Sequence, residues 1–237
     1  MTIDFSTWGS VTDGQRFAIP DSPLTQQASN IYLFGEGDGD ESSDAEGDKT
    51  ASLTEILWID GDGQDDFHVE VETTDTIIQI PQIFSDEEEF FVSFWVKTPD
   101  ERDSERVLSQ NGVNGANIWM GDDAWGWAVG GDIVDSENRP NLNEDVWSMV
   151  TITRDSDGEG TVYVHEVETG LADSGSENTS NPDWGDNDTN LLRQIDDTSG
   201  STSALPETKM DFAVFGKSHV SQSDVDDHYD STVDNYT

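Results

Sequence analysis

The sequence predicts an all-β fold made of two packed antiparallel sheets. Short segments of alternating apolar and polar residues, typical of half-buried strands, recur between clusters of Gly, Asp, Asn and Ser. Helical periodicity is almost absent, and 237 residues are enough for one substantial core. Many short strands paired in hairpins favour a two-sheet sandwich. The expected strands are residues 30–35, 54–59, 67–72, 76–81, 89–98, 105–109, 116–121, 125–130, 146–154, 160–168, 210–217 and 229–236.

Two hairpins support antiparallel pairing. The clearer one spans residues 143–168, and its turn RDSDGEG supplies Asp-Gly and a further Gly, which tolerate the positive φ angles of hairpin turns. The second spans residues 117–131 and reverses at Gly121, Asp122 and Asp123.

The domain organisation follows from where these strands lie. We expect an N-terminal arm or extra strand at residues 1–29, followed by one β-sandwich domain over residues 30–237. Residues 170–205 are expected to form a long polar loop within that domain. Loops of this length are uncommon in compact domains and are usually functional or mobile.

The charge balance predicts a protein adapted to very high salt. Acidic residues number 52 against 10 basic ones, giving a formal net charge of -42. Such a surface repels itself in dilute buffer, whereas in about 1 M salt the Debye length falls to about 3 Å and the repulsion is screened. We therefore expect a hypersaline, haloarchaeal setting. The same charge argues against binding nucleic acid or anionic lipid, which require basic patches.

The composition restricts location and chemistry further. Without cysteine the chain forms no disulfide and no zinc–thiolate site. Residues 1–14 have neither the basic start nor the apolar segment of a signal peptide, and no apolar run approaches the ~18 residues that span a membrane. A protein of this kind that works outside a cell is expected to have lost a leader or to leave as part of an assembled particle.

Several short motifs occur in an order that resembles one family. They include an aromatic strand at Tyr32 and Phe34, the pair Glu36-Gly37, the turn Asp44-Ala45-Glu46-Gly47, and the segments TIIQIP (76–81), FFVSFWVKT (90–98), RVLS (106–109), WSMVTITRD (147–155) and FAVFGKS (212–218). In this order they resemble laminin-G-like domains, which are jelly-roll sandwiches of the concanavalin A-like lectin fold. The resemblance covers about residues 30 to 236.

The resemblance also implies a structural calcium ion. Many laminin-G-like domains bind calcium near the Asp-x-x-Gly turn and the closing strand, which points to Asp44 and Asp234 in this chain. Oxygen-rich loops at residues 37–48, 60–66 and 182–190 carry the carboxylates that calcium prefers. So acidic a composition also produces such clusters as plain solvated loops. Both interpretations stand at this point.

The sequence contains no recognisable active site. Glycanases flank the scissile bond with two carboxylates, and glycanases of this fold commonly carry them as Glu-x-Asp-x-x-Glu, a run that this chain lacks. The nearest pattern is His68, Glu70 and Glu72, which share one face of a strand and are expected to form its solvated outer face. We therefore expect a protein that is not an enzyme.

Tryptophan residues supply the candidate ligand contacts. Trp125 and Trp127 share a face beside Asp122 and Asp123, and Trp184 in the polar loop is expected to be exposed. Flat aromatic rings stack on sugars, and polar groups fix the orientation. Core packing is the alternative role for Trp119, Trp125 and Trp127, and Trp95 and Trp147 are expected in the core.

These observations predict a non-catalytic recognition or structural module on the surface of a halophilic virion, such as a tail-fibre, turret or spike component. Its arm would dock on the particle or on a second copy of the chain, so a homo-oligomer is expected. Its loops would contact host-surface glycans or glycoproteins. The alternatives are a glycan-degrading enzyme on the same fold, a secreted or cell-surface adhesin of a haloarchaeon, and a structural decoration protein.

Overall fold

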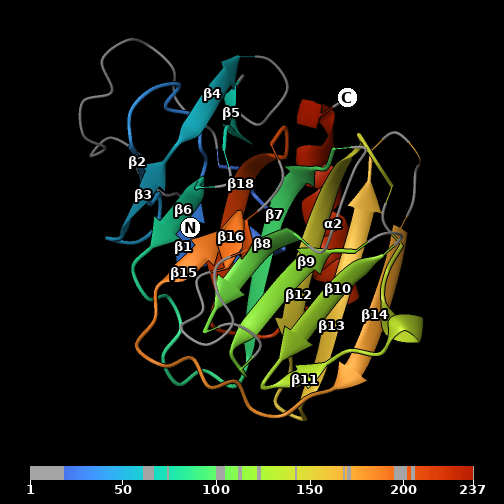
Figure 1. The fold of residues 1–237 in the computed structure, drawn as a ribbon. Coiled ribbons are helices and arrows are strands. Elements are labelled where there is room, and N and C mark those ends of the chain that lie inside the picture. The colour runs from blue at the N-terminus through green and yellow to red at the C-terminus, as the bar shows by residue number, and fades with distance from the viewer. Residues whose placement is uncertain are drawn as a thin grey trace.

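The computed structural model confirms the fold class: two eight-stranded antiparallel sheets form a sandwich (Figure 1). The structure describes residues 19–60, 67–73, 75–99, 105–111, 114–121, 124–141, 143–167, 169, 172–194, 202–203 and 206–236. Every expected strand except 229–236 overlaps an observed strand. Within the described residues no helix is long and apolar enough to cross a membrane.

The first sheet, called sheet 1 below, is built around the long apolar segments. In spatial order it contains β14 (Ala172–Asn178), β13 (Glu159–Glu166), β12 (Trp147–Arg154), β7 (Phe90–Lys97), β18 (Lys209–Gly216), β5 (Phe67–Val71) and β4 (Ile56–Asp60), and β1 (Asn30–Tyr32) also pairs with β18.

The second sheet, called sheet 2, packs against sheet 1. In spatial order it contains β11 (Asp132–Ile133), β10 (Trp125–Val129), β9 (Ala116–Met120), β8 (Glu105–Gln110), β15 (Thr189–Leu191), β6 (Ile77–Ile80), β3 (Thr50–Thr54) and β2 (Glu41–Ser43). A separate two-stranded ribbon joins β16 (Arg193–Gln194) to β17 (Thr202–Ser203).

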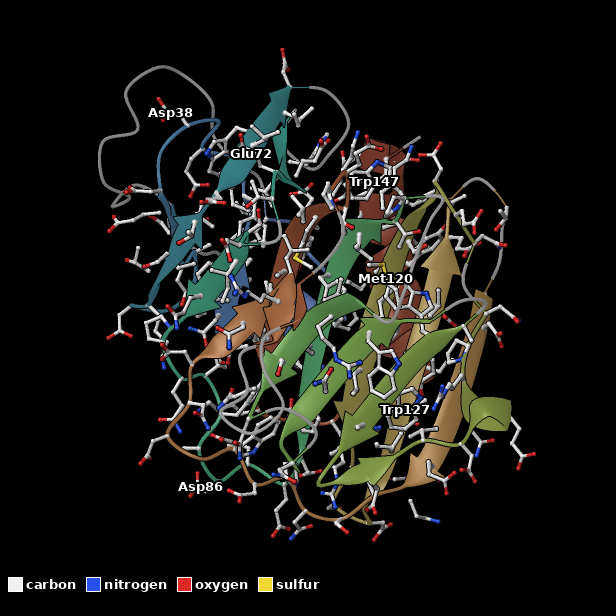
Figure 2. The ribbon with its side chains drawn as sticks, in the orientation of Figure 1. Asp38, Glu72, Asp86, Met120, Trp127 and Trp147 are labelled. Atoms are coloured by element: carbon white, nitrogen blue, oxygen red, sulfur yellow. The ribbon has the colours of Figure 1, made fainter. Side chains whose placement is uncertain are left out.

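The main core lies between the two sheets. Alternate residues of each strand point into it, as the period-2 patterns predict. Phe94 and Ile152 enter from sheet 1, and Met120 and Trp127 enter from sheet 2 (Figure 2). Acidic side chains such as Asp38 and Asp86 lie at the two ends of the molecule, where they are exposed (Figure 2).

A second apolar cluster covers the other face of sheet 1. Trp95 and Trp147 are buried there, beneath the C-terminal segment rather than between the sheets. The covering elements are α1 (Pro23–Gln27), α2 (Gln222–Thr232) and the 3-10 helix η3 (Val233–Tyr236), and Figure 1 shows α2 behind β12 and β13. A further short 3-10 helix, η2 (Ser136–Asn138), lies beside β14.

The expected closing strand at 229–236 is wrong, because these residues continue a helix. Ser221 caps α2, since its hydroxyl accepts from the Asp224 amide while the Asp224 carboxylate accepts from the Ser221 amide. The buried positions Val225, His228 and Thr232 follow helical spacing. Two of these three residues are polar, so the sequence does not display the helix as an apolar stripe.

The expected loop at 170–205 is also wrong in part. Its first half forms β14, which pairs with β13, and β15 inserts between β6 and β8. In β14 only Gly175 is buried, so this edge strand has no apolar alternation that the sequence could show. Of the expected arm at 1–29, residues 1–18 lie outside the described residues, and α1 lies within the remainder.

Candidate functional site

Trp119 marks the outer face of sheet 2, which is the face turned away from the core. On β9, Ala116, Ile118 and Met120 enter the core, so Asn117 and Trp119 point to the opposite side. No α-helix among the described residues lies in front of β9 and β10 (Figure 1). Trp119 and Asn117 are nevertheless only 8% and 0% exposed, so this part of the outer face is largely buried.

Gly126 provides the space in which the Trp119 ring lies. The two residues are register partners on β9 and β10, and a Cβ at position 126 would overlap the indole. The neighbours Trp125 and Trp127 point the other way and have no exposed surface. In the sequence Trp-Gly-Trp, the two tryptophan rings therefore point into the core, and the glycine has no side chain that would exclude the third ring, Trp119, from the outer face.

Two arginines lie on Trp119. The guanidinium carbon of Arg106 is 4.5 Å from the ring centroid, and that of Arg139 is 5.5 Å away. Arg139 also donates from Nε and Nη2 to the Val134 carbonyl at 3.0 and 2.9 Å. Burial lowers the pKa of Arg106, which means that its guanidinium has lost part of its hydration. Such contacts fix the planes of both guanidinium groups relative to the indole ring.

A row of polar side chains crosses the same face. Asn190, Ser109 and Asn117 are successive register partners on β15, β8 and β9, and Gln79 and Ser52 continue the row on β6 and β3. Directly opposed residues of an antiparallel sheet point to the same side, so the row lies beside Trp119.

Two oxygens of this row are buried and have no hydrogen-bond partner among the residues that the structure describes. They are Ser109 Oγ and Asn190 Oδ1, in side chains that are 0% and 5% exposed. An unpaired buried polar group costs about 1–3 kcal/mol, and natural proteins usually give such groups a partner. The outer face of sheet 2 therefore combines fixed cations, an aromatic ring and unused hydrogen-bonding capacity.

The predicted aromatic ligand contacts lie elsewhere. The expectation that Trp184 is exposed is wrong, because it is 1% exposed, packs against Phe84 and Phe90 at ring distances of 4.6 and 5.0 Å, and donates from Nε1 to the Glu87 carbonyl at 2.8 Å. Trp125 and Trp127 belong to the core. Asp122 and Asp123 lie outside the described residues. Of the three rings for which the sequence left both roles open, Trp125 and Trp127 lie in the core and Trp119 lies on the outer face of sheet 2.

Asp44 has a structural role that the sequence did not reveal. Its carboxylate accepts from the Ile31 amide at 2.9 Å, from the Glu46 amide at 3.1 Å, and from the Asn30 side chain. These bonds close the Asp-x-x-Gly turn against β1. Asp234 is an exposed residue of η3 and is not on a strand. The described residues contain no group of three or more His, Cys, Asp and Glu side chains that could hold a metal ion, and calcium binding stays a prediction.

The expected solvated face of residues 67–72 is partly wrong. Val69 and Val71 point into the core as predicted. His68, however, is only 2% exposed and meets Trp147 edge-on at 5.5 Å, because the C-terminal segment covers this side of sheet 1. Glu70 lies 3.8 Å from Lys209 in an ion pair. Glu72 is exposed as expected, so only the His68 end of this face is packed.

Comparison with known proteins supports the fold. No protein-family model matches the sequence, and no curated protein matches it. The structure is similar to the botulinum neurotoxin serotype D binding domain (TM-score 0.62, 12% identity, covering 87% of this chain and 52% of that chain). It is also similar to the botulinum neurotoxin serotype G binding domain (TM-score 0.60, 15% identity, covering 85% of this chain and 50% of that chain). A third similar structure is a Trypanosoma rangeli sialidase mutant displaying trans-sialidase activity (TM-score 0.60, 12% identity, covering 90% of this chain and 36% of that chain).

These similarities place the chain in a fold class, the lectin-like jelly-roll β-sandwich. At 10–15% identity they show the fold alone. The chain spans about half of the neurotoxin binding domains and about a third of the sialidase. Membership of the laminin-G-like family stays a prediction.

Proposed function

We propose that this chain is a non-catalytic module that recognises saccharides through the outer face of sheet 2. The observation that carries the proposal is Trp119, held flat on Gly126 beneath the guanidinium groups of Arg106 and Arg139. Saccharide sites combine planar apolar surface with a few oriented polar groups. The similar structures include neurotoxin binding domains, so the fold is compatible with a binding role.

The contact we propose is made by the guanidinium edges and the polar row rather than by stacking on the indole. Trp119 is only 8% exposed, because Gly126 and the two arginines occupy its faces. A small shift of the surrounding side chains would admit a saccharide hydroxyl to Ser109 Oγ and Asn190 Oδ1, the two unpaired oxygens. Satisfying them recovers part of the cost of their burial.

A glycan array in molar salt tests the proposal. The wild-type chain should bind a restricted set of saccharides, and Trp119→Ala should lose them because the arginines lose their support. Leu57→Ala is the control, since Leu57 is an exposed apolar residue on the edge strand β4 of the other sheet. Binding to no saccharide would contradict the function. Undiminished binding by a folded Trp119→Ala variant would place the site elsewhere.

The setting we propose is the surface of a virion in high salt, where the module contacts host glycans. The net charge of -42 supports the high-salt part of this proposal. The virion role is tested by mass spectrometry of purified particles from hypersaline cultures, in which the chain should be present at structural stoichiometry. Its absence from washed particles would favour a cell-surface adhesin instead. We also propose that the chain forms a homo-oligomer. Light scattering in the same salt measures its oligomeric state.

A further inference from the structure

We propose that the recognised saccharide carries an oxyanion, a carboxylate or a sulfate, and that Arg106 and Arg139 bind this group together above Trp119. The inference rests on the proposed saccharide-binding function and specifies the chemical class of the ligand. It makes the two arginines specificity-determining residues of the outer face of sheet 2.

The geometry gives both cations the same support. Arg106 is the register partner of Trp119 on β8, whereas Arg139 follows η2, so two separate elements bring their guanidinium groups to one ring at 4.5 and 5.5 Å. A stacked guanidinium directs its N–H groups sideways, in the plane that suits bidentate binding of a carboxylate or sulfate. The Trp119 ring thus acts as a platform that orients two cations.

The hydrogen bonds that Arg139 makes within the described residues involve two of the three nitrogens of its guanidinium group. Its Nε and Nη2 donate to the Val134 carbonyl, and it forms no ion pair with any residue that the structure describes. Four other basic side chains, Lys97, Arg193, Lys209 and Lys217, each pair with an Asp or Glu. In a chain with 52 acidic residues, Arg139 contacts Trp119 and pairs with no carboxylate among the described residues, so its charge is available to a ligand.

The medium determines how such a site selects its ligand. A net charge of -42 repels anions from most of this surface in dilute buffer, but molar salt confines that repulsion to a few ångströms. Short-range bidentate contacts then decide binding. The lost hydration of Arg106 reduces what an incoming oxyanion must displace. A neutral sugar can accept hydrogen bonds from the same guanidinium groups but gains no charge-assisted bidentate pair.

Matched saccharides separate this inference from the proposed function. Calorimetry in molar salt would compare a hexuronate oligosaccharide, the same oligosaccharide with its carboxylates reduced to alcohols, and a sulfated counterpart. We expect the uronate, the sulfated form or both to bind at least about tenfold more tightly than the neutral form. Arg106→Gln and Arg139→Gln should each abolish that difference, and Arg139→Lys should restore it only in part because the fork is lost.

Lys217→Gln is the control, because it removes the same charge from a residue that follows β18 and pairs with Glu87. Its affinities should equal those of the wild type. Thermal melting establishes that each variant is folded. Equal binding of neutral and anionic forms, unchanged in the arginine variants, would overturn the anionic ligand and leave the saccharide function standing. Binding of none of the probes, together with an empty glycan array, would overturn both.

Discussion

Trp119 lies directly on Gly126, and no side chain at position 126 is compatible with that arrangement. Gly126 contacts Trp119 on the outer face, and its two neighbours in the chain, Trp125 and Trp127, are buried in the core. The position of one glycine therefore decides where the ring that supports Arg106 and Arg139 can lie.

Gly126→Ala should displace Trp119 and weaken saccharide binding more than it weakens folding. The added methyl group overlaps the ring, which we expect to lower the free energy of unfolding by about 1–3 kcal/mol. Chemical denaturation and calorimetry measure the two effects. In the double variant with Trp119→Ala the clash is absent, so its destabilisation should be smaller than the sum of the single effects. Additive effects would contradict the contact.

Trp184→Ala should act on stability and leave the saccharide site intact. Removing a fully buried indole that packs on Phe84 and Phe90 and bonds to the Glu87 carbonyl should cost about 3–5 kcal/mol. Trp184→Phe should cost less, since most of the packing remains. Denaturant titration measures both. A Trp184→Ala variant of normal stability that loses binding would contradict the buried position of this ring.

His228 should make the molecule sensitive to mild acid. The ring is fully buried between α1 and α2, its Nδ1 lies 2.7 Å from Ser22 Oγ, and burial lowers its pKa to about 3. Below pH 6.5 the unfolded chain binds a proton that the folded chain does not bind. Stability should therefore fall as the pH drops from about 6.5 toward about 3, by up to about 1.4 kcal/mol per pH unit.

The comparison with His228→Gln isolates this contribution from that of the carboxylates. The variant should be less stable at pH 7, because the packing against Phe212 changes, but its stability should fall less steeply between pH 6 and 4. Denaturation curves at fixed molar salt give both slopes. Parallel pH profiles for the two proteins would show that His228 is not the responsible group.

Asp44→Ala should destabilise the turn at residues 44–47 whether or not calcium is present. The carboxylate accepts two backbone amides and the Asn30 side chain, so its loss should cost about 1–3 kcal/mol. Melting temperatures with calcium and with a chelator test the proposed calcium site in addition. Calcium should raise the melting temperature of the wild type and leave that of Asp44→Ala unchanged. An equal effect on both proteins would remove Asp44 from the calcium site.

The sequence was sufficient to predict the strands whose buried positions are filled by apolar residues. β7 and β12 were recognised from their apolar residues, although their burial does not alternate because both of their faces are covered. The pattern failed where burial falls on other residue types. In α2 the buried face contains His228 and Thr232, and in β14 the buried position is Gly175. The apolar pattern of the sequence therefore does not reveal these two elements, although Ser221 and Asp224 mark the start of α2.

The candidate site was accessible to sequence reasoning only in part. Alternation predicted that Trp125 and Trp127 share a face, but it does not decide which face of a strand meets the core. Arg106 and Arg139 are far apart in the chain, and only the strand register and the segment after η2 bring them to Trp119. The sequence signal that could have indicated the site was Gly126, which lies between Trp125 and Trp127 and pairs with Trp119 on the neighbouring strand.

A crystal structure of the protein with an oligosaccharide selected from the array, grown in molar salt, tests the central claim most directly. We expect ligand oxygens within hydrogen-bonding distance of Arg106 and Arg139, with the sugar lying along the polar row that includes Gln79 and Asn190. A ligand bound at the end loops of the sandwich, with the outer face of sheet 2 unchanged and free of sugar, would contradict it.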